Sequence, residues 1–184
     1  MSRPDTTRLW CACALLAVAL AVTPVGATTY LPITFKELIA QADVIFIGDV
    51  ADVRPYTLRT QTGTLVKTRV TFRVNEALYG TNSIVEVLDF LGGEADGLGM
   101  AVEGMPKFAV GDRRVVFARH KSSVNPIVGF TQGLLRVGRD TGGVDRVFTL
   151  DALSGRRMAP QSPAMTLTDF RTRVVTALAE ARKR

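Results

Sequence analysis

The chain has 184 residues, two cysteines, one histidine and a formal net charge of +6 at pH 7. A chain of this length is one ordinary domain that buries enough interior to fold without disulfides. The excess of positive charge favours anionic surfaces without naming one, and a single histidine leaves a zinc site almost no ligands.

The first 27 residues have the pattern of an export signal. Arg3 and Arg8 precede an apolar run over 9–22, which small residues follow at 25–27. The alternative is a permanent anchor, but the run is shorter than the roughly 20 apolar residues that cross a bilayer. We expect cleavage after Ala27 and a secreted or periplasmic chain with no stable membrane anchor. Both cysteines leave with the signal, so the mature chain has none.

A short helix is predicted directly after the signal. Thr34 is placed as its N-cap, and Glu37 three residues later completes a capping box. The helix is expected from about Phe35 to Gln41.

Several short strands follow. The run over 44–53 is β-branched and aromatic with a bulge or bend at Gly48, and 66–74 alternates apolar and polar residues as a strand with one wet face does. Further strands are expected over 84–91 and 113–120, and the segment after 125 leads into a hairpin with a glycine-rich turn. The predicted core includes Val44, Phe46, Val70, Phe72, Val74, Val87, Val116 and Phe117.

The chain ends in a predicted amphipathic helix. Leu167, Phe170 and Val174 recur at helical spacing, and Thr166 or Thr168 can cap the helix. These patterns predict a mainly β fold: a small closed or partly closed barrel of five or six strands with a short N-terminal helix and a C-terminal helix. The expected organisation is a signal peptide over 1–27, the barrel over 28–155, and a loop with the packed helix over 156–184.

Three motifs together resemble a known family. The stretches "QADVIFIGDVADV", "TRVTFRVNEALYG" and "PKFAVGDRRVVF", within about 35–118, are similar to the netrin-like domain. That family includes the tissue inhibitors of metalloproteinases, so the resemblance implies an OB-type barrel and an extracellular metalloprotease as the first partner to test. A closer likeness is to uncharacterised secreted bacterial proteins of this build. The inhibitors start with a cysteine that chelates the zinc of the protease. The mature chain would start at Thr28, so the resemblance does not extend to inhibition through an N-terminal cysteine.

The connection over 92–108 is long and rich in glycine. Connections of this length in a compact domain are usually functional or mobile. We expect a folded flap with an exposed end, which Met105, Pro106 and Phe108 anchor to the barrel; the alternative is a cap for stability alone. The residues predicted to contact a partner are Gly97, Leu98, Gly99 and Met100.

Motifs for catalysis and cofactors are weak. "GLGMAV" lacks the third small residue and the following helix of a dinucleotide fingerprint, and Gly97 stands where a calcium turn needs an aspartate, so no cofactor and no metal are expected. "GFTQG" has the spacing of a nucleophile elbow around Thr131, but His120 precedes it instead of following. A bend between strand segments is the simpler interpretation of that motif.

Nucleic acid is not an expected partner. Lys67, Arg69 and Arg73 share a strand face, but the aromatic Phe72 points to the opposite side, and single-strand binding requires aromatic platforms on the basic face. The sequence therefore predicts an exported, non-enzymatic binding module that contacts a protein or envelope component through its loops. The alternative is a secreted hydrolase that uses a carboxylate or Thr131, with the carboxylate drawn from Asp43, Asp49, Asp52, Glu76, Glu86 and Asp89.

Overall fold

The computed structural model describes residues 32–149 and 165–181. The predicted signal, its cleavage position, the loop over 156–164 and the basic residues 182–184 lie outside these ranges. The first described element is helix α2 (Phe35–Gln41), and its capping box is confirmed. The Thr34 backbone N–H donates to Glu37 Oε2 at 2.8 Å, and the Glu37 N–H donates to Thr34 Oγ1 at 3.3 Å. The local pattern alone therefore sets this helix start.

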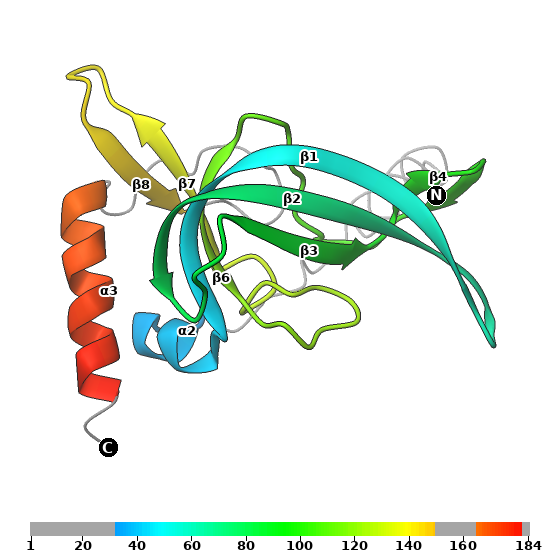
Figure 1. The fold of residues 1–184 in the computed structure, drawn as a ribbon, viewed down its shortest axis with the longest axis horizontal. Helices are drawn as coiled ribbons and strands as arrows, with labels where there is room; N and C mark the ends of the chain where they lie inside the picture. The colour runs from blue at the N-terminus through cyan, green and yellow to red at the C-terminus, as the bar shows by residue number, and fades with distance from the viewer. Residues whose placement is uncertain (1–31, 150–164, 182–184) are drawn as a thin grey trace, which may run out of the picture. The chain divides into compact units, whose positions relative to one another are not determined.

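The described strands form a seven-stranded antiparallel sheet and a separate two-stranded hairpin (Figure 1). The strand order in the large sheet is β3-β2-β1-β6-β7-β8-β9. The hairpin pairs β4 with β5, and helix α3 (Leu167–Ala181) follows β9. The strands are β1 (Val44–Thr60), β2 (Gly63–Tyr79), β3 (Val85–Leu91), β4 (Gly93–Ala95), β5 (Leu98–Met100), β6 (Arg113–Ala118), β7 (Leu134–Arg139), β8 (Asp145–Thr149) and β9 (Met165–Thr166).

Four strands of the large sheet form a Greek key. Strands β1, β2 and β3 follow one another as antiparallel neighbours, and β6 then returns to lie beside β1. The long connection that permits this return carries the small β4–β5 hairpin. Three consecutive strands with the fourth beside the first define this motif. The mainly β class is thus confirmed, with a helix near either end of the described chain.

The large sheet has seven strands instead of the expected five or six, and it does not close, so the closed form of the expected barrel is wrong. Strands β3 and β9 are its two edges, and no pair joins them among the described residues. Connections take the place of a closing strand. The Leu91 N–H donates to the Val124 carbonyl at 2.8 Å, and Met105, Phe108 and Ile127 pack into the hydrophobic cluster beside β3. Loop side chains therefore fill space that barrel closure would have enclosed.

Each face of the sheet carries its own hydrophobic core because successive strand residues point to opposite faces. On one face Ile45, Ile47 and Phe117 pack with helices α2 and α3. Phe35 of α2 lies edge-on to Phe170 of α3, with ring centroids 5.9 Å apart. On the other face Phe46 and Phe72 pack edge-on at 5.5 Å.

The predicted core is confirmed with one exception. Val44, Phe46, Val70, Phe72, Val116 and Phe117 are fully buried, and Val74 packs partly buried against the same cluster. Val87 is exposed, because the inward positions of β3 are Leu88 and Phe90. Both parities of "IVEVLDFL" carry apolar residues, so its alternation did not identify the buried side. The bend at Gly48 is also confirmed: the β1–β2 register shifts there, and a Cβ would lie 2.8 Å from the Arg73 carbonyl oxygen.

Strands β1 and β2 continue well beyond the core. We call the segments Arg54–Thr60 and Gly63–Arg69 the outer ribbon; they pair with each other in unbroken register. Within these segments Val66 is the one buried residue, while Leu58 and most of its neighbours are exposed. The long curved pair is visible in Figure 1, where its tip extends past β3. Backbone pairing, and not core packing, therefore maintains the outer ribbon.

Candidate functional site

The residues predicted to contact a partner lie on the β4–β5 hairpin. Its two-residue turn is Asp96-Gly97, with φ of 52° and 74°. Positive φ at both central residues is typical of a type I′ turn, for which Asp-Gly is a preferred sequence. Leu98 on β5 is 46% exposed, and Met100 is half-buried. A Cβ at Gly97 or Gly99 would meet no atom within 4 Å, so this end of the hairpin is open.

The base of the hairpin is tightly attached to the outer ribbon. The Gly92 N–H donates to the Val66 carbonyl at 2.8 Å, and Thr68 Oγ1 donates to the Gly92 carbonyl at 2.8 Å. At the tip, Thr57 Oγ1 donates to Asp96 Oδ2 at 2.7 Å. A Cβ at Gly93, where φ is 125°, would lie 2.5 Å from Thr68 Oγ1. Glycine is thus required for this close approach.

The chain then returns to the core, as expected for a folded flap. Met105 and Phe108 pack against the core cluster. The Phe108 ring lies 4.8 Å from the Phe90 centroid and edge-on to Phe72 at 5.8 Å. The connection is therefore fixed at both its start and its end, and the hairpin projects between them.

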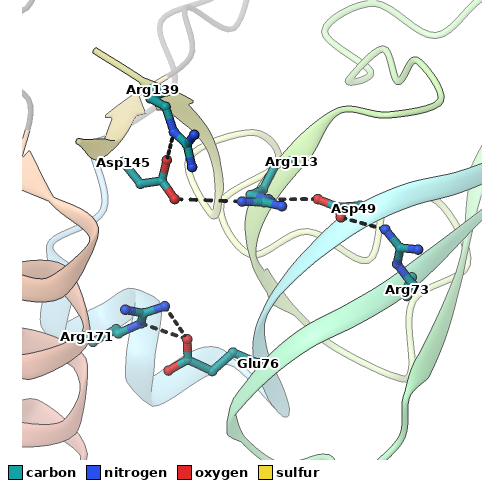
Figure 2. A network of polar contacts seen from close by, with 7 residues as sticks. All are labelled: Asp49, Arg73, Glu76, Arg113, Arg139, Asp145 and Arg171. Atoms are coloured by element: carbon teal, nitrogen blue, oxygen red, sulfur yellow. Dashed lines mark hydrogen bonds and ion pairs between the residues drawn. The ribbon is translucent and has the colours of Figure 1, made fainter. Parts of the chain in front are cut away.

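A second polar arrangement crosses the sheet and was not predicted. Asp49 on β1 accepts hydrogen bonds from Arg73 Nη2 on β2 at 3.0 Å and from Arg113 Nε on β6 at 2.9 Å. Asp145 on β8 lies 3.7 Å from Arg113 Nη1 and accepts a hydrogen bond from Arg139 Nε on β7 at 3.2 Å. Figure 2 shows this alternating series, Arg73–Asp49–Arg113–Asp145–Arg139, which we call the charge chain.

The sheet geometry explains how these residues meet. Asp49 is the cross-strand partner of both Arg73 and Arg113, and Asp145 is the partner of Arg139. Directly opposite side chains on one face of a sheet lie close enough to interact. By alternation, Asp49 and Arg113 share the face of Ile47 and the helices. The charge chain therefore continues the helix-covered core as a polar surface.

The arginines keep the central carboxylate ionised. Hydrogen bonding from the Arg113 guanidinium, supported by Asn75 and Arg73, lowers the pKa of Asp49 to about 2, although partial burial acts in the opposite direction. In return Asp49 raises the pKa of Arg113. Asp49 is the best shielded member, with its side chain 15% exposed, whereas Arg73 and Arg139 at the two ends are 70% exposed.

The charge chain lines a cleft of about 760 Å³. All of its residues border the cleft, together with Val50, Val110 and Val137 and the backbone of Gly111 and Gly138. This volume is within the range of small-molecule sites, which is about 300–1,000 Å³. The cleft is thus lined both by charged side chains and by valine side chains.

A related cluster lies further along β2. Arg69 donates two hydrogen bonds to Asp89, at 2.9 and 3.0 Å, and Tyr56 Oη donates to the same carboxylate at 3.0 Å. The Arg69 guanidinium, and then Tyr56, lower the pKa of Asp89. The basic strand face noted in the sequence is therefore largely committed to ion pairs with aspartates.

The other chemically suggestive residues are dispersed. Thr131 is buried, at 7% exposure, in a turn held by the Gly129 carbonyl. His120 lies at the end of β6, where its backbone N–H donates to Asp43 Oδ2 at 2.9 Å. Among residues 32–149 and 165–181, no three His, Cys, Asp or Glu side chains gather as a group that could hold a metal ion.

The sequence matches no protein-family model, and comparisons with curated proteins and with solved structures found no match. In the described part of the chain, no helix is long and apolar enough to span a membrane. The geometry of the described residues is therefore the basis for a functional proposal.

Sequence reasoning missed two features of this site. The Asp96-Gly97 dipeptide, flanked by Leu98, is a hairpin signal that was open to detection. The charge chain had no comparable signal, because its members come from five strands and meet only once the register is known. The Arg113-Arg114 doublet is the start of β6, but only Arg113 belongs to the charge chain, since Arg114 is buried and pairs with Asp112.

Proposed function

We propose that this chain is an exported binding module that performs no chemistry and contacts a protein or envelope partner through the β4–β5 hairpin and the outer ribbon. The observation that carries the proposal is the exposed, apolar Leu98 on a hairpin outside the core that is hydrogen-bonded to the outer ribbon. A hairpin already ordered before binding loses little conformational entropy on contact. Leu98 and the half-buried Met100 are alternate residues of β5 and so lie on one face, and contiguous exposed apolar surface marks interaction sites.

We also propose that the strand arrangement is OB-like. The Greek key of β3-β2-β1-β6 with β7 beside it gives five consecutive strands. OB-folds are five-stranded, partly open Greek-key barrels. This agreement supports the OB-like proposal and, with it, the netrin-like resemblance. On that resemblance an extracellular metalloprotease is the first partner to test.

Two observations favour a binding module over the alternative hydrolase. Thr131 is buried, so a substrate would have to displace the surrounding turn to reach its hydroxyl. Asp49 and Asp89 are held by arginines that lower the pKa of each carboxyl. A general acid for glycoside hydrolysis requires a raised pKa instead.

The test compares two double variants in a binding experiment. Leu98→Ser with Met100→Ser removes apolar surface from the hairpin, and Ile84→Ser with Val175→Ser removes exposed apolar side chains elsewhere. We expect the wild type and the control variant to bind a shared partner, taken first from a panel of extracellular metalloproteases and then from periplasmic or extracellular extract. We expect the hairpin variant to lose that binding while it melts at nearly the same temperature. Equal binding by both variants would contradict the proposed surface, and substrate turnover abolished by Thr131→Ala would contradict the proposed class.

A further inference from the structure

The cleft beside the charge chain has features that interstrand ion pairing alone does not account for. Arg73 and Arg139 are 70% exposed, and each commits one nitrogen to the chain, Nη2 in Arg73 and Nε in Arg139. Ion pairs this exposed contribute little to stability, because solvent screens them and long side chains lose freedom. Their remaining N–H donors are available to a ligand.

The charge chain is also unbalanced. It contains three arginines and two aspartates, so its formal charge is +1 (3 − 2). Asp49 stays ionised at neutral pH because the Arg113 guanidinium lowers the pKa of its carboxyl. A ligand that balances the cluster must therefore be an anion.

The aspartates hold the arginines in place. Arg113 lies between Asp49 and Asp145 and is bound to both, while each end arginine is oriented by one of these carboxylates. Guanidinium groups that are held before binding recognise planar or tetrahedral oxyanions by paired hydrogen bonds, and less entropy is lost on contact. Arg73 and Arg139 stand on β2 and β7, with β1 and β6 between them. Two separate donor groups thus face the same cleft.

We propose that this cleft binds small multivalent oxyanions, that is, molecules that carry two or more phosphate or carboxylate groups. Arg113 at the centre and one of the two end arginines, Arg73 or Arg139, would contact the acidic groups of one ligand, and Val110 and Val137 would line its less polar part. Asp49 and Asp145 act as positioning residues that orient the guanidiniums. This site is separate from the β4–β5 hairpin, so either proposal can fail without the other.

The test is isothermal titration calorimetry at low ionic strength with two probes, pyrophosphate for the phosphate class and citrate for the carboxylate class. Three proteins are compared: the wild type, Arg73→Gln with Arg139→Gln, and a control with Arg146→Gln and Arg171→Gln. The control removes the same charge from arginines that are also paired with carboxylates but do not line the cleft. Circular dichroism and melting temperature establish that each variant is folded, and Arg139→Gln alone replaces the double variant if that one does not fold.

We expect the wild type to bind at least one probe, with an affinity that falls as salt is added. The cleft variant should bind about tenfold more weakly or worse, since each charge-assisted hydrogen bond is commonly worth a factor of that size. The control should match the wild type, and the probe should shift the backbone amide resonances of Gly111 and Gly138. The proposal is overturned if neither probe binds the folded wild type, or if the control loses affinity as much as the cleft variant.

Discussion

The inner and outer halves of the β1–β2 ribbon share the same two strands but differ in what stabilises them. The inner half, residues 44–53 of β1 and 70–79 of β2, packs into the core, with Phe46, Val70 and Phe72 fully buried. The outer ribbon keeps its hydrogen-bonded register while nearly all of its side chains are solvent-accessible. Strand pairing extends well past the core, so the length of these strands is not explained by core formation. We interpret the outer ribbon as a support for the β4–β5 hairpin.

The largest expected effect separates these two halves. Phe72→Ala should lower the free energy of unfolding by about 3–5 kcal/mol, the range for large-to-small changes in a packed core. Leu58→Ala on the outer ribbon should change it by less than about 0.5 kcal/mol, because surface substitutions seldom do more. Urea denaturation of the two variants measures both. Similar losses in the two would show that the outer ribbon belongs to the cooperative core.

The next comparison is between the base and the tip of the hairpin. Gly93→Ala should cost about 1–3 kcal/mol, because φ is 125° and the new Cβ would approach Thr68 Oγ1 to 2.5 Å. Gly97→Asn should cost only a few tenths of a kcal/mol, because asparagine tolerates positive φ and the site is open. Thermal melts of both variants test this. A Gly93→Ala protein as stable as the wild type would mean that the hairpin is not seated on the ribbon as described.

A smaller effect concerns the charge chain at acid pH. The pKa of Asp49 is about 2 in the folded protein against an ordinary value of 3.8, so its carboxylate binds fewer protons folded than unfolded in this window. Its contribution to stability is complete above about pH 4 and is lost as the pH falls toward 2. Asp49→Asn should therefore reduce the difference in unfolding free energy between pH 4 and pH 2. Denaturant melts at the two pH values measure this difference, with Asp52→Asn as a control. If the unfolding free energy changes equally between pH 4 and pH 2 in the wild type and in Asp49→Asn, the lowered pKa of Asp49 is contradicted.

Local patterns predicted the parts of this fold that local interactions determine. The capping box at Thr34 sets the start of α2, the alternation around Val70 identifies the wet and buried faces of β2, and the Leu167–Val174 stripe packs as the buried side of α3. The outer ribbon was not predicted over its full length. Polar residues and Pro55 break the apolar pattern there, although backbone pairing continues.

Features that depend on long-range geometry were missed or were wrong. Closure of the sheet depends on whether edge strands or loop residues such as Phe108 and Ile127 fill the space beside β3, which no local pattern reveals. The charge chain depends on the cross-strand register that places Asp49 between Arg73 and Arg113. A folded flap over 92–108 was predicted from its glycines and apolar residues, because those properties belong to the segment itself, but its β4–β5 hairpin was not.

The most direct test shortens the outer ribbon and follows both stability and binding. Thr57 and Val66 are cross-strand partners, so residues 58–65 can be replaced by an Asn-Gly turn without breaking the pairing that remains. Combined with Leu98→Ser and Met100→Ser, this change should leave the free energy of unfolding within about 1 kcal/mol of the wild type and should abolish binding of any partner that the wild type captures. A shortened protein that unfolds, or one that stays folded and still binds that partner, would contradict the division into a stabilising inner half and a recognising outer half.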